Sequence, residues 1–253
     1  MGARSDGSLH PGLRHNTLRP RRAGPDSVAD KVFKAFDDSE SGGEAIIGGT
    51  GRVEGDFLPQ ALGGVANLVV PSHPASVDAF RAAAANRPLA IEVGPGKGRF
   101  LNALAALHPE MTCLGIDTRL GFCLTTLRRA ARAGRTNLFA GWGDARAVLP
   151  LLVRPGEASE AYLLFPDPWW KRRHAGRRHG PAMAAAIATA LAPGGRLVLK
   201  SDVAEYLDAI VAAFTSTGAY DPATMPSDLP LTDREARLTQ SGVRVFSAAL
   251  SRR

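Results

Sequence analysis

From Leu89 onward, short apolar runs alternate with stretches of helical periodicity, and this alternation limits the possible folds more than any other feature of the chain. It is typical of βαβ units around a parallel sheet. The apolar runs predict strands over Leu89–Val93, Thr112–Asp117, Asn137–Ala140, Ala161–Phe165 and Arg196–Lys200. The periodic stretches predict helices over Gly98–Leu107, Leu120–Ala133, Pro181–Leu191 and Val203–Thr217, with a tight turn at Pro193-Gly194-Gly195. With an antiparallel edge strand expected at Val243–Leu250, the predicted fold is α/β, with a mostly parallel sheet and helices on both faces.

The amino-terminal third of the chain lacks this periodicity. It is rich in arginine at first and then in glycine and acidic residues, and the glycines weaken any helix or strand assignment. We therefore expect a poorly ordered extension over residues 1–80, with room for one short element at 66–70, followed by a domain over 81–253. An Arg-rich transit peptide is the alternative for the first residues, but Asp6 and three prolines disfavour the amphipathic helix it needs.

Composition excludes several classes of protein. No apolar run reaches the ~18 residues of a membrane span, and two cysteines are too few for a disulfide scaffold or a four-ligand zinc site. Cys113 and Cys123 are expected to be reduced, packed thiols of a cytoplasmic protein. The net charge is +7, and residues 89–253 carry all of it because the charges of the preceding segments cancel. A basic domain attracts polyanions, but charge alone does not separate a nucleic-acid partner from simple solubility.

A glycine-rich segment follows the first predicted strand and reads Glu-Val-Gly-Pro-Gly-Lys-Gly from Glu92 to Gly98. The glycines Gly94, Gly96 and Gly98 allow positive φ and close approach of a ligand to the backbone. Dinucleotide enzymes use G-x-G-x-x-G instead. A carboxylate two residues before the first glycine would repel a pyrophosphate and attract the ammonium group of S-adenosylmethionine. We therefore interpret Glu92–Gly98 as an S-adenosylmethionine loop.

Two further acids end the next two predicted strands. Asp117 lies where a carboxylate accepts both ribose hydroxyls of an adenosine ligand, and Asp144 is placed to meet the adenine edge. Each acid alone is equally well explained as a helix cap. Three acids at successive strand ends, together with the glycine loop, favour cofactor binding.

The fourth predicted strand ends at Pro166-Asp167-Pro168, and the prolines hold the Asp167 carboxylate at the sheet edge, near the expected methyl group. Trp169 and Trp170 follow, either to stack on a base or to pack in the core. A basic cluster without an acid comes next, and it favours phosphate contact over a merely solvated face. Its members are Lys171, Arg172, Arg173, His174, Arg177, Arg178 and His179.

The segment from Phe165 to His174, Phe-Pro-Asp-Pro-Trp-Trp-Lys-Arg-Arg-His, resembles the signature of the bacterial tRNA (guanine-N7)-methyltransferase family. The resemblance runs from about Leu89 to the carboxyl end. It implies a Rossmann-like methyltransferase fold. It also implies methyl transfer from S-adenosylmethionine to N7 of a guanine in the variable loop of tRNA (position 46), forming 7-methylguanosine.

The resemblance also implies roles for individual residues. Glu92, Asp117 and Asp144 match cofactor ligands, and Asp167 matches an acid assigned to both cofactor contact and catalysis. The positions implied for substrate contact are Lys171, Asp202, Thr232, Asp233, Arg234 and Glu235. Those implied for RNA contact are Arg172, Arg173, His174, Arg177 and Arg178. The element Thr232–Glu235 departs from the family's Thr-Lys-x-Glu in its middle, which reads Asp233-Arg234 here.

Guanine N7 carries an in-plane lone pair and needs no general base, so the enzyme's task would be alignment. Asp167 would stabilise the developing positive charge, and Asp202 and Glu235 would accept the N1–H and N2–H donors. We expect no metal, no membrane contact, and a monomer or homodimer. The alternatives are a methyltransferase for another RNA, a protein or a small molecule, an NAD(P)-linked reductase, and a non-catalytic RNA-binding module.

Overall fold

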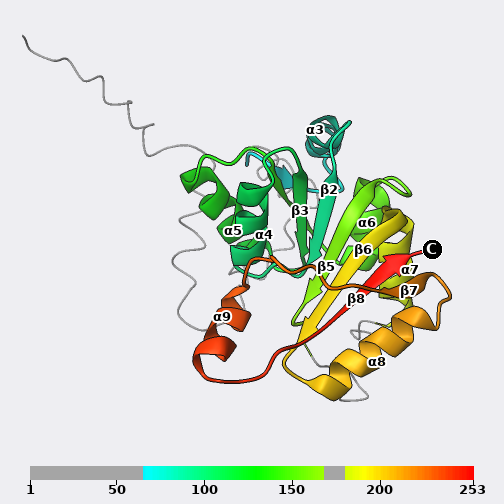
Figure 1. Cartoon of the computed structure of the whole chain (residues 1–253). Helices are drawn as coiled ribbons and strands as arrows, with labels where there is room; N and C mark the ends of the chain where they lie inside the picture. The colour runs from blue at the N-terminus through cyan, green and yellow to red at the C-terminus, as the bar shows by residue number, and fades with distance from the viewer. Residues whose placement is uncertain (1–64, 168–179) are drawn as a thin grey trace, which may run out of the picture.

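The computed structural model describes residues 65–167 and 180–253, and these form one α/β fold around a single mixed sheet (Figure 1). The strands are β1 (Leu68–Val69), β2 (Leu89–Val93), β3 (Thr112–Asp117), β4 (Leu138–Trp142), β5 (Ala158–Leu164), β6 (Leu191–Ser201), β7 (Tyr220–Ala223) and β8 (Phe246–Arg252). The helices are α3 (Pro74–Ala84), α4 (Arg99–Leu107), α5 (Leu120–Arg132), α6 (Ala145–Leu152), α7 (Pro181–Ala190), α8 (Ala204–Thr215) and α9 (Asp233–Gln240). The predicted α/β class is confirmed.

The strand order is β1-β4-β3-β2-β5-β6-β8-β7. The first six strands of this order are parallel, whereas β8 is antiparallel to both β6 and β7. The antiparallel direction of the last strand is as predicted, but its place at the edge is not. β7 pairs with the outer side of β8 and is itself the edge strand. A four-residue strand containing Pro222 carries too little apolar periodicity to be recognised in the sequence.

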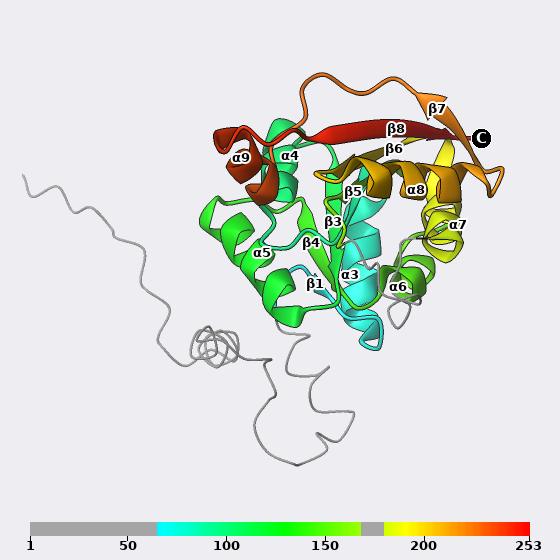
Figure 2. The same ribbon diagram turned by 90° about the horizontal axis from the view of Figure 1, so that it is seen from below.

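The sheet has a core on each face because successive side chains of a strand point to opposite sides. Helices α3, α6, α7 and α8 pack on one face, around residues such as Ile91 and Leu163. Helices α4 and α5 cover the other face, around residues such as Ala90 and Tyr162. Figure 2 shows the two layers, with α9 beside α4 and α5. Cys113 and Cys123 are free and buried, as predicted.

Residues 65–80, which were predicted to belong to the poorly ordered extension, are part of the fold. β1 pairs with β4 at the edge of the sheet, and α3 buries Val77 and Phe80 against the core. The boundary predicted between residues 80 and 81 therefore falls inside α3. The remainder of the predicted extension, residues 1–64, lies outside the described residues.

Two local features also differ from the sequence-based expectation. Helix α6 was not predicted, since Pro150 lies within it and interrupts the helical pattern. The expected turn at Pro193-Gly194-Gly195 falls inside the span of β6. There the register steps from Ala158↔Leu191 to Glu160↔Arg196, so the intervening residues of β6 leave the ladder as a bulge.

Candidate active site

The carboxyl ends of β2 to β6 meet at one edge of the sheet, and each ends in an acid or is followed within three residues by glycines or an acid. Parallel registers place Val93 beside Ile116 and Asp117 beside Trp142, so the segments that follow these strands are neighbours. In an open α/β sheet this is the edge where ligands bind. Residues from five strand ends are thus available to one site.

The glycine loop leaves β2 and enters α4 with all three glycines at positive φ, at 74° for Gly94, 55° for Gly96 and 72° for Gly98. A Cβ atom added at Gly94 or Gly96 would meet nothing within 4 Å, so the backbone there faces open space. At Gly98 an added Cβ would lie 2.3 Å from Oγ1 of Thr126 on α5. The first two glycines therefore leave room for a ligand, while Gly98 lets α4 and α5 pack closely.

Glu92 lies buried beneath this loop, with 2% of its surface exposed. Its Oε2 atom accepts no hydrogen bond from the described residues, although a buried carboxylate oxygen normally has a partner. Burial raises the pKa of the Glu92 carboxyl group to about 8, and the nearby Asp117 adds to the shift. The site thus holds a buried acceptor that a cationic ligand would satisfy, which fits the ammonium group of S-adenosylmethionine.

Asp117 ends β3 and is held by two backbone N–H groups. Arg119 donates to Oδ1 at 2.9 Å and Gly96 donates to Oδ2 at 3.3 Å, so the carboxylate joins its own turn to the glycine loop. Burial raises the pKa of Asp117, against the lowering effect of the Arg119 N–H group. The structure therefore brings Glu92 and Asp117 together at the loop, as the sequence predicts.

Asp144 follows β4 and caps α6. Its Oδ1 atom accepts from the N–H group of Arg146 at 3.0 Å and also from Nε of the same side chain at 3.0 Å. The helix-cap alternative for this acid is therefore realised. Contact with the adenine edge stays a prediction, and it requires the half-buried carboxylate to share its oxygens with Arg146.

Asp167 lies two residues beyond Phe165, which carries the turn at the end of β5. Phe165 adopts a φ of 53°, a conformation that costs a non-glycine residue roughly 1–2 kcal/mol. Its N–H group donates to the Lys200 carbonyl at 2.8 Å, and its ring packs against the core. The hydroxyl group of Tyr206 then donates to the Asp167 carbonyl at 3.0 Å. These contacts leave the Asp167 side chain exposed at the sheet edge.

The first two residues of α9 tie the helix to the fold by ion pairs. Asp233 lies 3.4 Å from Nη1 of Arg129 on α5 and 3.9 Å from Nη1 of Arg99 on α4. Arg234 lies 2.7 Å from Oδ2 of Asp202, just after β6. The two residues that depart from the family's element thus have partners of their own, and Asp202 is already neutralised by a guanidinium group.

The third residue of α9, Glu235, is the most buried. Its N–H group donates to Oγ1 of Thr232 at 2.9 Å, which caps the helix. Its Oε1 atom accepts from Nζ of Lys200 at 2.7 Å. Its Oε2 atom is buried and, among the described residues, has no partner. A second unsatisfied carboxylate oxygen thus lies at the same edge of the sheet as that of Glu92.

Comparison with known proteins identifies the family. The family described as "Putative methyltransferase" matches residues 86–248. A tRNA (guanine-N(7)-)-methyltransferase from Thermosynechococcus vestitus is 34% identical over 168 residues, covering 64% of this chain and 78% of that protein. The protein of the same name from Myxococcus xanthus is 34% identical over 175 residues, covering 64% and 82%. The chain belongs to the tRNA (guanine-N(7)-)-methyltransferase family.

A solved structure agrees at the level of the fold. A point mutant of the 16S rRNA (adenine(1408)-N(1))-methyltransferase from Catenulisporales acidiphilia, with the cosubstrate SAM, is similar with a TM-score of 0.53. The two sequences are 20% identical, and the match covers 70% of this chain and 91% of that one. The Rossmann-like methyltransferase fold is therefore confirmed for this family member.

Part of the predicted site lies outside the described residues. This part comprises Trp169, Trp170, Lys171, Arg172, Arg173, His174, Arg177, Arg178 and His179. In the described ranges, no group of three or more His, Cys, Asp or Glu side chains is placed to hold a metal ion. None of the helices in the same ranges has the length and apolar character needed to cross a membrane.

Sequence reasoning missed two residues that shape this family member's site. Lys200 was assigned only to a strand, although a charged residue ending an apolar run needs a buried partner. Tyr206 was assigned only to a helix, and a tyrosine hydroxyl in a buried position also needs a partner. Neither signal identifies the partner. The tertiary structure shows that Lys200 pairs with Glu235 and that Tyr206 donates to the Asp167 carbonyl.

Proposed function

We propose that the chain transfers the methyl group of S-adenosylmethionine to N7 of a guanine in tRNA. The observation that carries the proposal is the partnerless oxygen of buried Glu92 beneath two glycines that face open space. Glu92 holds the ammonium group and Asp117 the ribose hydroxyls, with Gly94 and Gly96 against the ligand. The choice of tRNA and of N7 rests on membership of the family and on the basic cluster after Asp167.

The main task of this chain is to align guanine N7 with the methyl group of S-adenosylmethionine. N7 attacks the methyl carbon with its lone pair as the carbon–sulfur bond breaks, and no proton moves. The backbone of Asp167 is held by the turn at Phe165 and by the hydrogen bond from the Tyr206 hydroxyl group to the Asp167 carbonyl. Its exposed carboxylate stabilises the positive charge that develops on the purine.

Recognition of the base falls to Glu235. Its Oε2 atom is an acceptor without a partner in the described residues, suited to the N1–H or N2–H donor of guanine. Asp202 was predicted to share this role, but Arg234 lies 2.7 Å from its Oδ2 atom. We therefore assign base recognition to Glu235. The role of Asp202 is to anchor Arg234. The exposed guanidinium group of Arg234 keeps further N–H donors, which can bind a phosphate group.

One experiment tests the function. The full chain is incubated with methyl-labelled S-adenosylmethionine and tRNA transcripts that lack modification, and the digested nucleosides are identified. Recovery of labelled 7-methylguanosine from the variable loop is the expected result. Another labelled nucleoside would assign the enzyme to a different base. Labelled protein or small molecule, with no labelled RNA, would overturn the RNA substrate.

The salt dependence separates the same alternatives. Binding of a polyanion releases counterions, so the KM for tRNA should rise steeply between 50 and 200 mM salt, by roughly tenfold or more. The KM for S-adenosylmethionine should change little, because its ligands are buried. An activity that is insensitive to salt would favour a protein or small-molecule substrate.

A further inference from the structure

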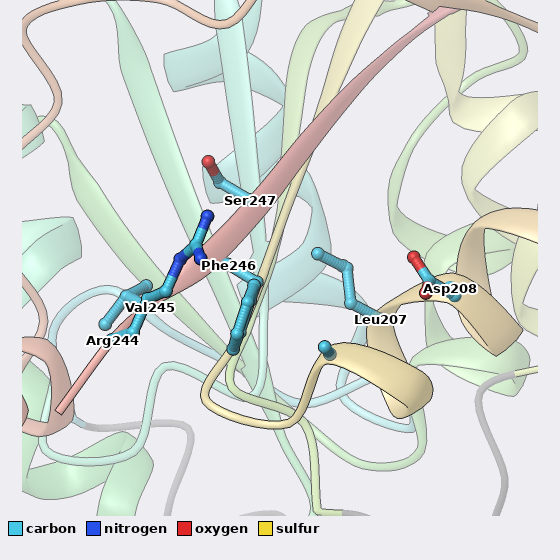
Figure 3. Close-up of a pocket in the computed structure, with 7 residues that line it drawn as sticks. Leu207, Asp208, Arg244, Val245, Phe246 and Ser247 are labelled. Carbon is cyan, nitrogen blue, oxygen red and sulfur yellow. The ribbon is translucent and has the colours of Figure 1, made fainter.

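A pocket of about 300 Å³ lies between the start of β8 and the first turns of α8, apart from the glycine loop (Figure 3). It is lined by Ala204, Leu207, Asp208, Arg244, Val245, Phe246 and Ser247. This volume is at the lower end of the range of small-ligand sites, about 300–1,000 Å³. None of its lining residues belongs to the cofactor site or to the predicted substrate positions.

Half-buried Phe246 and exposed Arg244 form a wall that suits one face of a flat aromatic group, whereas Leu207 is almost fully buried. Figure 3 shows Phe246 on the strand and Leu207 on the helix on opposite sides of the opening, with Arg244 on the far side of the ring from Leu207. The Arg244 guanidinium lies 5.0 Å from the centre of the Phe246 ring. The hydroxyl group of Ser247 and the carboxylate of Asp208, both on exposed residues, add polar groups at the rim.

The pocket adjoins the catalytic edge through two direct connections. Leu207 immediately follows Tyr206, whose hydroxyl group donates to the Asp167 carbonyl. On the other wall, Phe246 pairs with Ser201, the last residue of β6 before Asp202. A nucleotide that occupied the pocket would therefore be a near neighbour of a base held at Asp167.

We propose that this pocket binds one unpaired nucleotide of the RNA substrate, adjacent to the guanine that is methylated. The base stacks on the accessible face of the Phe246 ring, and Arg244 contacts the phosphate group. An enzyme that acts on a base in a recessed site takes that base out of its stack, so the neighbouring nucleotide needs a new stacking surface. An aromatic ring with an arginine beside it is such a surface. This inference rests on the proposed function and names a subsite of it.

The test uses the full chain with S-adenosylmethionine and tRNA, and compares Phe246→Leu, Phe246→Tyr and Arg244→Gln with wild type. Loss of the ring should raise the KM for tRNA about tenfold with little change in kcat, and Phe246→Tyr should restore the wild-type KM. Arg244→Gln should lower the slope of log KM against log salt by about 0.7 to 0.9, the value for one phosphate contact. Arg154→Gln, an exposed arginine before β5, is the matched control and should leave the slope unchanged.

Binding is read directly with tRNA transcripts that carry 2-aminopurine at single positions flanking the target guanine. Quenching at one flanking position on binding to the complex with S-adenosylhomocysteine is expected, and its loss in Phe246→Leu confirms the subsite. Unchanged S-adenosylhomocysteine affinity shows that the variant is folded.

Three results would overturn the subsite. The first is a wild-type KM for Phe246→Leu with no position-specific quenching. The second is a concentration-dependent dimer that Phe246→Leu abolishes, because the pocket would then be a contact between two copies of the chain. The third is a wild-type chain that methylates no RNA, which removes the proposed function together with its subsite. In the first two cases the wild-type chain still methylates tRNA. Failure of the subsite can therefore be distinguished from failure of the proposed function.

Discussion

Nζ of Lys200 lies 2.7 Å from Oε1 of Glu235, and both side chains are largely buried, at 9% and 11% exposed. The pair joins the end of β6 to the first turn of α9, and it leaves the second carboxylate oxygen of Glu235 without a partner among the described residues. One oxygen is thus fixed by the fold, and the other is a buried acceptor without a partner there. Under the proposed function, Lys200 is a positioning residue for Glu235, the acid to which we assign base recognition.

Lys200→Met should reduce both stability and tRNA recognition. Removing one partner of a buried pair leaves an uncompensated charge, which costs about 3–5 kcal/mol in a fully buried site and somewhat less here. Urea unfolding measures the loss. The double variant Lys200→Met/Glu235→Leu should recover stability but not kcat/KM for tRNA. Recovery of both would show that the pair has a structural role only.

The affinity for S-adenosylmethionine should rise with pH because of Glu92. Its pKa is raised to about 8 by burial, and the ammonium group of the ligand favours the ionised form. Affinity measured by calorimetry should therefore increase up to about tenfold per pH unit from pH 6 and level off near pH 8. Glu92→Gln should bind more weakly and without this dependence. A pH-dependent Glu92→Gln would assign the effect to another group.

The Glu92 carboxyl group should also make the stability of the unligated protein depend on pH, and this stability should fall as pH rises. Between the ordinary pKa of about 4.5 and the folded value of about 8, the unfolded chain has lost the Glu92 proton while the folded chain keeps it. The free energy of unfolding therefore falls as pH rises through this window. Thermal unfolding at pH 6 and pH 8 should show a smaller decrease in Glu92→Gln than in wild type.

Substitution of alanine for Gly98 should mainly lower the stability of the fold, whereas substitution for Gly94 should mainly lower the affinity for the cofactor. Gly98→Ala places a methyl group 2.3 Å from Oγ1 of Thr126 at a φ of 72°, so we expect a loss of stability of about 2 kcal/mol or more. Gly94→Ala meets no atom within 4 Å and carries only the backbone strain, but its methyl group enters the ligand space. It should lower cofactor affinity at least tenfold. Equal effects of the two variants on cofactor affinity would contradict this division.

Asp167→Asn should lower kcat by a larger factor than it lowers the affinity for S-adenosylhomocysteine, since the family resemblance also implies a cofactor contact for Asp167. Loss of one group that stabilises developing charge typically costs about 10²–10³ in kcat. The Tyr206 bond is made to the backbone of Asp167, so the variant should keep the turn. Single-turnover methylation with saturating tRNA measures the effect. Wild-type turnover in this variant would exclude the electrostatic role.

Much of the fold could be predicted because its signals are local. The strands at Leu89–Val93 and Thr112–Asp117 agree with the structure residue for residue, since continuous apolar runs between turn signals define buried parallel strands. β1 falls within the short element expected at 66–70, whereas β7 was missed because a strand of four residues has no measurable periodicity. α6 was missed because Pro150 interrupts its pattern.

The sequence by itself determined the fold class, the glycine loop and the acids at the strand ends, because each is a pattern within a few consecutive residues. The tertiary structure alone decided which of these groups are free to act. It paired Asp202 with Arg234 and Lys200 with Glu235, residues 32 and 35 positions apart. It also placed Gly98 where α4 and α5 pack closely and left Gly94 and Gly96 facing open space. Such pairings depend on how helices pack on the sheet, and helix packing is not encoded in any local spacing of residues.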